Sequence, residues 1–330
     1  MVTMITFWFK NARYQALPQS LLPALLAVGM SSKSAGFSLI LGSLAIVGIL
    51  FVHLSINLFD DYFDYKVQKT GYRDELVRQG VRARIAKCDY LTSGAATLKQ
   101  LLMACFVFGS IALVFGIIIF MQRGMPILYL TVATALLGIS YSGPPLRLSY
   151  RGLGELLIGL MFGPLSMAGV YYAACGSFEI PVVLIFVPVG LLVATIVYSH
   201  SIMDYEPDKQ VGKMTLAVLL GNKKSMLVCL FLLLSVPFLM VGMGVIFQYL
   251  PISYLFVFLT LPMAVSLFYM MIEFVKHPQR HFAPRWWMGP MPQWKQIQAV
   301  GLDWFMIRWL LARNLLTFFC LILIIISFIQ

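Results

Sequence analysis

NLFDDYFD at residues 57–64 and DYEPD at residues 204–208 each close a long apolar run of the sequence. The chain has only 13 Asp and Glu residues in 330, and five of them are the Asp residues of these two stretches. Ionisable groups at the edge of a hydrocarbon-length helix are costly to bury and usually mark function. The two stretches therefore indicate both the fold, a bundle of membrane helices, and the place of a site. We call Asp60, Asp61 and Asp64 the first acidic cluster, and Asp204 and Asp208 the second acidic cluster.

Composition extends this reading to the whole chain. Hydrophobic residues make up 60% of it and charged residues 11%, with a mean hydropathy of +0.88; an average soluble domain has roughly a quarter charged residues. Windows of about 20 apolar residues are long enough to cross about 30 Å of hydrocarbon. We expect an all-α polytopic membrane protein, a single domain over residues 1–330. Its nine predicted helices are 15–30, 36–59, 98–121, 126–142, 153–175, 180–203, 224–247, 251–275 and 309–329.

The distribution of Lys and Arg predicts the orientation, because these residues favour the cytoplasmic side of helix ends. With nine crossings and the N-terminus inside, 22 of the 24 Lys and Arg fall in or beside the inner segments, and only Lys33 and Arg123 fall outside them. One helix more or fewer scatters these charges over both faces. We expect the N-terminus and both acidic clusters in the cytoplasm, the C-terminus outside, and a bacterial plasma membrane as the location.

The net charge of +11 does not call for a nucleic-acid partner, because the bias of Lys and Arg toward one face explains most of it. The five Cys residues form no CxxC pair, so they indicate neither a zinc site nor a disulfide framework. No small-residue cleavage site follows the N-terminal stretch, and we expect no cleavable signal peptide. The expected partners are the lipid bilayer and an anionic substrate attracted to the basic face.

The first acidic cluster ends a predicted helix. At about 100° per residue, Asp60 and Asp64 share one face of this helix. Asn57 and Asp61 share the adjacent face, so the four side chains form an acidic wall. The basic loop 65–97 follows at once, and a loop of this length between packed helices typically acts as a lid or binding loop. The candidates for substrate binding here are Asn57, Lys66 and Lys69.

The segment after the fourth predicted helix brings basic groups to the same face. It reads YSGPPLRLSYRGLGE at 141–155, where the Pro pair ends the helix and places two Arg on a stiff turn. Glu155 suits the N-terminus of the next helix on dipole grounds alone and receives no catalytic role. The substrate-binding candidates of this segment are Tyr141, Arg147 and Arg151.

The sixth predicted helix carries the second acidic cluster. His200, Asp204 and Asp208 recur every four residues and would share a face if the helix continued, but Pro207 predicts that it unwinds near Asp208. A short basic loop follows, with Lys213 as a further candidate for binding an anionic substrate.

A Trp-rich segment at 276–308 separates the last two predicted helices. Four Trp lie there among Pro and basic residues, a pattern typical of an amphipathic cytoplasmic lid or of a segment that lies in the membrane interface. His277 and His281 stand four residues apart, but Pro278 and the absence of nearby carboxylates argue against a metal pair.

Two carboxylate clusters at matching depth require cations, because bare like charges are unstable in a low dielectric. Oxygen ligands suit Mg²⁺, which is typically bound by one or two carboxylates together with substrate phosphates. A site open to lipid favours a diphosphate with a hydrophobic tail, so a prenyl diphosphate fits. Mg²⁺ and basic residues then neutralise the leaving group as the allylic C–O bond ionises. The expected metal ligands are Asp60, Asp61, Asp64, Asp204 and Asp208.

Together these motifs resemble the UbiA superfamily of intramembrane prenyltransferases. The resemblance rests on the first acidic cluster, on YSGPPLRLSYRGLGEL at 141–156 and on DYEPDKQVGKMTLAVLLG at 204–221. The last two strings and ARYQALPQSLLPALLA at 12–27 are most similar to 1,4-dihydroxy-2-naphthoate prenyltransferases of menaquinone synthesis. The resemblance implies nine helices in a bundle around a lateral cavity, Mg²⁺-dependent prenyl transfer and acidic motifs that face the cytoplasm.

The resemblance carries over residue by residue. Asp60 stands where the first family motif has Asn, and Asp61 and Asp64 match its following Asp residues. The second motif maps onto the second acidic cluster, with Met203 and His200 in place of an Arg and an Asn. The resemblance thereby implies catalytic roles for Asp60, Asp64, Asp204, Asp208 and His200, of which His200 or a cluster Asp is the base for the acceptor.

The resemblance also implies an acceptor. Dihydroxynaphthoate would be alkylated at its carboxylated ring carbon with loss of CO₂, which gives demethylmenaquinone. Arg147 and Arg151 are candidates for binding its carboxylate, and either would equally suit the diphosphate or a lipid headgroup. The sequence leaves open 4-hydroxybenzoate, homogentisate, a chlorophyll precursor, haem and a glycerophosphate lipid, because ring recognition rests on a few apolar contacts.

Other classes of protein fit the sequence less well. A cation-coupled transporter also places Asp on helices of a bundle, but it is expected to have internal repeats and acids near the middle of the membrane. A scaffold role would make both clusters anchors for helix ends. A soluble prenyl diphosphate synthase also uses DDxxD pairs, but nine apolar spans exclude that architecture.

Overall fold

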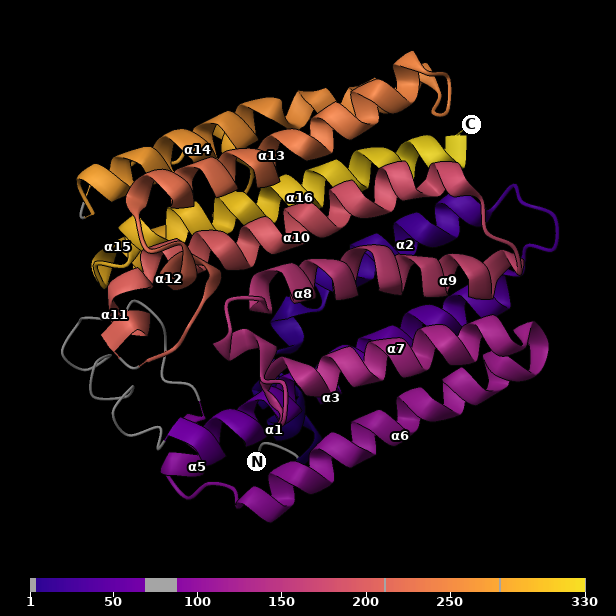
Figure 1. Ribbon diagram of the computed structural model, residues 1–330, viewed down its shortest axis with the longest axis horizontal. Helices are drawn as coiled ribbons and strands as arrows, with labels where there is room; N and C mark the ends of the chain where they lie inside the picture. Colours follow the sequence, from indigo (N-terminus) through magenta and orange to yellow (C-terminus); the bar gives the residue numbers. More distant parts are fainter. Residues whose placement is uncertain (1–3, 69–87, 211, 279, 330) are drawn as a thin grey trace. The chain divides into compact units, whose positions relative to one another are not determined.

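The computed structural model describes residues 4–68, 88–210, 212–278 and 280–329, and these residues fold into helices without any β-strand (Figure 1). They form two compact units, each described here by itself. Unit 1 is Met1–Leu148 with Leu165–Phe178, and unit 2 is Ser149–Pro164 with Glu179–Gln330. The all-α fold expected from composition is confirmed.

Unit 1 is a layer of long helices with a short N-terminal helix against one end. Its elements are α1 (Met4–Asn11), η1 (Tyr14–Ala16), α2 (Pro18–Ser31), α3 (Leu39–Gln68), α5 (Asp89–Thr92), α6 (Leu98–Arg123), α7 (Met125–Ser142) and α9 (Ser166–Cys175). In Figure 1 the helices α3, α6 and α7 lie side by side, in agreement with the contacts between them.

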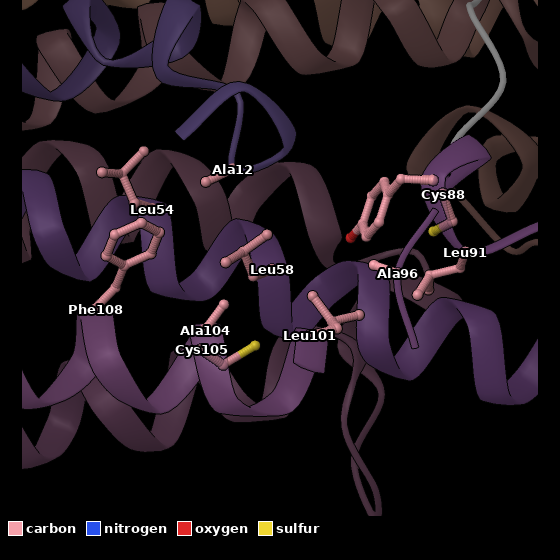
Figure 2. Packing of buried hydrophobic residues seen from close by; sticks show 11 residues of the cluster. Ala12, Leu54, Leu58, Cys88, Leu91, Ala96, Leu101, Ala104, Cys105 and Phe108 are labelled. Carbon is pink, nitrogen blue, oxygen red and sulfur yellow. The ribbon is translucent and has the colours of Figure 1, made fainter. Parts of the chain in front are cut away.

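The core of unit 1 at the first acidic cluster is formed by α3 and α6. Leu54 and Leu58 of α3 face Leu101 and Phe108 of α6, and Ala12 closes the same cluster (Figure 2). Burial of each such side chain contributes roughly 1.5–3 kcal/mol in water, and in lipid the equivalent gain comes from close packing. This core fixes the end of α3 that carries the acids against the N-terminal segment.

The start of α6 is set by its own sequence. Thr97 accepts a hydrogen bond from the backbone N–H of Gln100 at 3.2 Å, and the side chain of Gln100 accepts one from the backbone N–H of Thr97 at 2.8 Å. This reciprocal pair is a capping box, which satisfies two of the backbone donors that every helix N-terminus leaves open.

Arg123, one of the two basic residues outside the predicted inner segments, has a structural role at the far end of α6. Its guanidinium donates to the backbone carbonyls of Ala173 at 2.9 Å, Ala174 at 2.7 Å and Gly36 at 2.9 Å. The first two carbonyls lie in the last turn of α9, where a helix presents partial negative charge. Arg123 therefore joins the ends of α6 and α9.

Unit 2 contains the remaining helices. They are α8 (Gly154–Leu160), η3 (Met161–Leu165), η4 (Ile180–Val182), α10 (Val183–Met203), α11 (Tyr205–Gln210), α12 (Leu216–Leu220), α13 (Lys223–Ile246), η5 (Ile252–Thr260), α14 (Leu261–Lys276), η6 (Trp286–Met288), α15 (Trp294–Ala299) and α16 (Asp303–Ile329); η2 (Leu148–Tyr150) lies at its boundary with unit 1. Helix α10 contacts α8, α13 and α16, so the helix that leads to the second acidic cluster is central in this unit.

Gly159 of α8 and Gly163 of η3, which continues α8, approach Gly190 of α10 until the backbones touch. A Cβ added to Gly163 would lie 2.3 Å from the Cα of Gly190, and one added to Gly159 would lie 2.6 Å from the carbonyl oxygen of Gly190. Only glycine fits such an approach, which is typical of membrane helices packed through small residues.

Eight stretches of the described chain are long and apolar enough to cross a membrane. They correspond to the second through ninth predicted helices. The first predicted helix appears as α2, which has 14 residues and is therefore about 21 Å long, short of the roughly 30 Å of hydrocarbon. The expectation of nine helices is thus approximately met, with a short first one.

Candidate functional site

The first acidic cluster lies in the last turns of α3. Asp61 and Asp64 are buried, with 2% and 3% of their surface exposed, and the Asp60 side chain is 15% exposed. Asp60 and Asp64 are one helical turn apart and so share a face, as the sequence predicted. Asp61 is rotated away from that face, and its contacts are of a different kind.

Asp61 is held by two residues from distant parts of unit 1. Arg13 donates to Oδ1 of Asp61 in an ion pair, and the Tyr90 hydroxyl donates to Oδ2 at 3.0 Å. A second guanidinium nitrogen of Arg13 lies 3.8 Å from Oδ2 of Asp60. Both carboxylate oxygens of Asp61 are therefore engaged by protein donors.

The charge states of these two donors follow from their surroundings. Burial by itself lowers the pKa of Arg13, but the carboxylates of Asp61 and Asp60 outweigh it and raise the pKa above its ordinary value. Burial, and then the charge of Asp61, raise the pKa of the Tyr90 phenol. Arg13 is accordingly a cation and Tyr90 a neutral donor at physiological pH.

Asn57 also serves the attachment of the N-terminal segment. Its side-chain amide donates to the backbone carbonyl of Ala12 at 2.9 Å. One turn earlier on α3, His53 lies 2.8 Å from the hydroxyl of Ser20 at the start of α2. Asn57, a sequence candidate for substrate binding, thus holds the residue before Arg13 and helps to place Arg13 beside Asp61.

The end of α7 meets the exposed side of the first cluster. Ser142 donates from its hydroxyl to Oδ1 of Asp60 at 2.5 Å. Gly143 allows this approach, since a Cβ there would lie 3.0 Å from the Phe63 ring. Tyr141 and Arg147 flank this contact in the sequence, and the buried Nε of Arg147 has no hydrogen-bond partner among the described residues.

The predicted basic loop 65–97 is described at residues 65–68, where α3 continues, and at residues 88–97, which contain α5. The ammonium group of Lys66 stacks over the ring of Tyr62, 4.8 Å from its centroid. Lys69 and the loop cations up to residue 87 lie outside the described residues, so the expectation that this loop covers the site stays a prediction.

The second acidic cluster lies at a break between two helices of unit 2. Asp204 ends α10, and α11 begins at the next residue and includes Asp208. Both carboxylates are buried, with 4% and 2% exposed. The predicted unwinding near Asp208 is replaced by a break at Asp204, because Pro207 falls in the first turn of α11, where its missing N–H costs nothing.

His200 lies beside this cluster as its spacing predicted. Its Nε2 is 3.6 Å from Oδ2 of Asp204, one helical turn away on α10. Its ring contacts Phe305 edge to face, with 5.0 Å between centroids. The imidazole is therefore oriented by a carboxylate on one side and an apolar ring on the other.

Arg151 and Lys213 are brought to the second cluster through the backbone. Arg151 pairs with Met214 in a short parallel bridge, and the N–H of Gly152 donates to the Met214 carbonyl at 2.7 Å. The N–H of Lys213 donates to the carbonyl of Asp208 at 2.9 Å. The segment of Arg151 and the segment of Lys213 are thus joined by backbone contacts beside Asp208.

Glu155 fastens this loop to the helices. Its carboxylate accepts from the hydroxyl of Ser201 at 2.6 Å and from the backbone N–H of Leu216 at 3.1 Å and 3.2 Å. Leu216 is the first residue of α12, so the carboxylate satisfies an open donor at a helix N-terminus. The position of Glu155 at the N-terminus of its own helix was predicted from the sequence, but its contact with the N-terminus of α12 was not.

The donor chemistry fits Mg²⁺. Within residues 4–68, 88–210, 212–278 and 280–329, no three His, Cys, Asp or Glu side chains are grouped to hold a metal by themselves. Each cluster instead supplies a pair of carboxylates one turn apart, Asp60 with Asp64 and Asp204 with Asp208. Mg²⁺ is usually held by one or two carboxylates together with phosphate oxygens, so both pairs suit it.

Three contacting residues were not among the sequence candidates, namely Arg13, Tyr90 and Ser142. Arg13 lies in the 12–27 string that carried part of the resemblance, which was a usable signal. Tyr90 and Ser142 meet the first cluster only through tertiary packing, so no local pattern marks them.

The fold and these residues define a polytopic helical membrane protein with a carboxylate pair at the end of a helix in each unit. The sequence pattern of the UbiA prenyltransferase family matches residues 20–289, and the chain belongs to this family. It is an integral membrane protein, and the family and its named relatives are prenyltransferases.

Curated relatives include two naphthoate enzymes. The chain is 26% identical over 216 residues to a 1,4-dihydroxy-2-naphthoate octaprenyltransferase of Bacillus subtilis, which covers 64% of this chain and 65% of that protein. It is 31% identical over 214 residues to a 2-carboxy-1,4-naphthoquinone phytyltransferase of Synechocystis, with 64% of each chain covered. The match therefore spans slightly less than two thirds of these relatives.

Solved structures share the fold. A structure of a digeranylgeranylglyceryl phosphate synthase superposes with a TM-score of 0.64 at 17% identity, covering 99% of both chains. A UbiA homologue from Archaeoglobus fulgidus, bound to GPP and Mg²⁺, superposes with a TM-score of 0.56 at 14% identity, covering 96% of this chain and 99% of that one.

Proposed function

We propose that the protein transfers a polyprenyl group from a prenyl diphosphate to 1,4-dihydroxy-2-naphthoate in a Mg²⁺-dependent reaction that gives the quinol form of demethylmenaquinone. The observation that carries this proposal is the buried carboxylate pair in each unit of a chain that belongs to this family. The names of the relatives from Bacillus subtilis and Synechocystis support the naphthoate acceptor. The A. fulgidus homologue, solved with GPP and Mg²⁺, supports the donor and the metal.

The carboxylates divide into two roles in this proposal. Asp60 with Asp64, and Asp204 with Asp208, hold Mg²⁺ together with the oxygens of the diphosphate. Bound Mg²⁺ supplies neutralisation of the charge that develops on the departing diphosphate. Asp61 has both oxygens engaged by Arg13 and Tyr90, so we assign it to positioning the end of α3 rather than to the metal.

Basic residues complete the charge balance. Arg151, which is bridged to Met214, and Lys213, whose backbone N–H donates to Asp208, bind diphosphate oxygens, as does Lys66 beside the first cluster. Arg147 binds the acceptor carboxylate, and its buried Nε without a hydrogen-bond partner among the described residues supports this. A guanidinium suits a carboxylate because its parallel N–H donors match the two oxygens.

The proposed reaction breaks the bond to the diphosphate and the bond to the carboxyl group, and it forms one C–C bond. The allylic C–O bond of the donor breaks and its electron pair leaves with the diphosphate. The ring carbon that bears the carboxyl group of the acceptor supplies the pair for the new C–C bond, and loss of CO₂ restores the aromatic ring. His200, oriented by Asp204 at 3.6 Å, accepts the proton of an acceptor hydroxyl.

The same proposal includes an orientation. The basic residues gather with the acidic clusters at predicted inner segments, so we place the N-terminus and the clusters in the cytoplasm and the C-terminus outside, in a bacterial plasma membrane. Arg123 is one of the two exceptions to the charge pattern. Its guanidinium donates hydrogen bonds to backbone carbonyls of α9 and of Gly36.

Product analysis tests the proposal. Purified protein in lipid nanodiscs is incubated with prenyl diphosphates of several lengths and with a panel of aromatic and glycerophosphate acceptors, with Mg²⁺ or with EDTA. The expected product is prenylated naphthoquinol that has lost CO₂, seen by mass spectrometry only with Mg²⁺. If only a different acceptor is prenylated, the naphthoate assignment is overturned. If no Mg²⁺-dependent product forms, prenyl transfer itself is overturned. The matched control is Glu206→Gln, an exposed acid next to the second cluster, which should keep full turnover.

A further inference from the structure

The segment that follows α14 runs back along the helices instead of extending beyond their ends. The ring of Phe282 contacts Tyr269 of α14, with 6.0 Å between centroids. Five residues later, the indole N–H of Trp287 donates to the hydroxyl of Ser266 at 3.1 Å. Because Ser266 lies about 15 Å along α14 from its last residue, Lys276, at 1.5 Å per residue, the chain descends beside α14.

The segment turns at Gly289 and is fastened there by α16. The side-chain amide of Asn314 donates to the backbone carbonyls of Met288 at 2.9 Å and Pro290 at 3.0 Å. Gly289 has a φ of 78°, and a Cβ there would lie 2.8 Å from the ring of Phe318. The turn therefore requires glycine for both its backbone conformation and its contact with α16.

The depth of this turn follows from helix geometry. Asn314 lies roughly 16 Å along α16 from its first residue, Asp303, and the helix itself is about 40 Å long. Both α14 and α16 belong to stretches long and apolar enough to cross a membrane. The turn therefore lies beside the spanning part of two helices and not in the water beyond them.

The start of the segment is polar, and its charged side chains have acidic partners. Arg280 pairs with Glu273, and His281 Nδ1 lies 2.6 Å from Oδ2 of Asp303. Arg308 is fully buried and donates from Nε to the Met270 carbonyl at 3.1 Å. These contacts tie the start of the segment to the ends of both helices.

The outer side of the segment is aromatic. Trp286 is 89% exposed, and its ring meets that of Trp287 edge to face. Arg285 beside it is also exposed. Exposed Trp is typical of the boundary between headgroups and acyl chains, and a neighbouring Arg can extend its long side chain to the headgroups.

We propose that residues 282–293 form a hairpin embedded in the lipid at the boundary between headgroups and acyl chains, with Trp286 among the upper acyl chains, Arg285 reaching lipid phosphates, and Asn314 as the clasp. The partner of this surface is the bilayer itself. Of the two readings of the Trp-rich segment, this proposal takes the segment that lies in the membrane interface and not the cytoplasmic lid. The proposal is independent of the chemistry proposed for the acidic clusters.

Spin-label accessibility tests the depth. The label is attached to Trp286→Cys in the full-length protein with Cys229→Ser, whose other four cysteines are buried, and the protein is studied in phosphatidylcholine nanodiscs. Val265→Cys, on the exposed face of α14, serves as the reference in lipid, and Gln298→Cys, exposed on α15, as the reference in water. Collision with oxygen reports lipid, and collision with a polar nickel chelate reports water.

The expected result at position 286 is a greater accessibility to oxygen than to the nickel chelate, as at position 265 and opposite to position 298. A label at 286 that behaves like the one at 298 overturns the proposal. A second variant, Asn314→Leu, keeps the branched shape of the side chain and removes both hydrogen bonds to the hairpin. The label at 286 should then become more mobile and more accessible to nickel, while the label at 265 is unchanged; an unchanged label at 286 overturns the role of Asn314.

Discussion

Arg13 and Asp61, 48 residues apart in the sequence, form an ion pair between the N-terminal segment and the acidic end of α3. The Asp61 side chain is only 2% exposed, and Tyr90 donates to its second oxygen. The pair shows that one member of the first acidic cluster is already satisfied by the protein.

Arg13→Gln should destabilise the protein, because it leaves the buried Asp61 carboxylate without its counter-charge, a loss of about 3–5 kcal/mol for a buried pair. The measurement is thermal unfolding in detergent. Lys10→Gln, an exposed neighbour, is the control and should unfold like the native protein. In the double variant with Asp61→Asn, the loss should be smaller than the sum of the two single losses. Strictly additive losses would contradict the coupling.

Asp64→Asn and Asp208→Asn should reduce turnover by about 10²–10³-fold, because each removes a carboxylate that acts on the charge developing in the transition state. Both variants should unfold at close to the native temperature and need more Mg²⁺ for half-maximal activity. Asp61→Asn should show the opposite pattern: its main effect should be a clear loss of stability and not a loss of turnover. If Asp61→Asn keeps its stability and Asp64→Asn loses it, the assignment of ligand and positioning residue is wrong.

Glu155→Ala should loosen the loop that carries Lys213, because it leaves the N–H of Leu216 without its acceptor and leaves the hydroxyl of Ser201 with only the Val197 carbonyl. The expected cost is roughly 1–3 kcal/mol for buried donors left unsatisfied. Hydrogen exchange of residues 209–217 should become faster. Ser201→Ala retains the contact between Glu155 and Leu216 and should leave that exchange near native; equal acceleration in both variants would argue against Glu155 as the fastening residue.

Gly163→Ala should be severely destabilising, because its methyl group would meet the Cα of Gly190 at 2.3 Å in a contact of two backbones. Gly169→Ala, in the same predicted span, has no atom within 4 Å of the added Cβ and should be neutral or slightly stabilising, since Ala favours a helix by about 1 kcal/mol over Gly. Yield of folded protein on gel filtration measures both. Similar yields of the two variants would contradict the close approach.

Much of the fold followed from hydropathy. The predicted helices 98–121 and 180–203 correspond to stretches described as Leu98–Arg123 and Ile180–Met203, because an apolar run in a membrane has no alternative that satisfies its backbone. The break in the helix was predicted near Asp208 but lies at Asp204. The effect of Pro207 depends on whether this residue falls inside a helix or in its first turn. Pattern alone does not fix that register.

The candidate site was predictable where its residues repeat with the helical period, as in Asp60 with Asp64 and His200 with Asp204. The partners of these residues were not, because Arg13, Tyr90 and Ser142 reach the first cluster from other elements by packing. The DDxxD pattern shows three similar carboxylates, and only their neighbours distinguish the one that is already paired.

The glycine contact between α8 and α10 has a mechanical consequence. Two backbones in contact have no side-chain rotamers to rearrange, so the distance between these helices should hardly respond to the thickness of the surrounding bilayer. A thinner or thicker membrane is accommodated by tilting or by moving flanking side chains, and in unit 2 that adjustment falls to helices packed through long side chains. The break at Asp204, at the end of α10, would thereby keep its place relative to α8 in membranes of different composition.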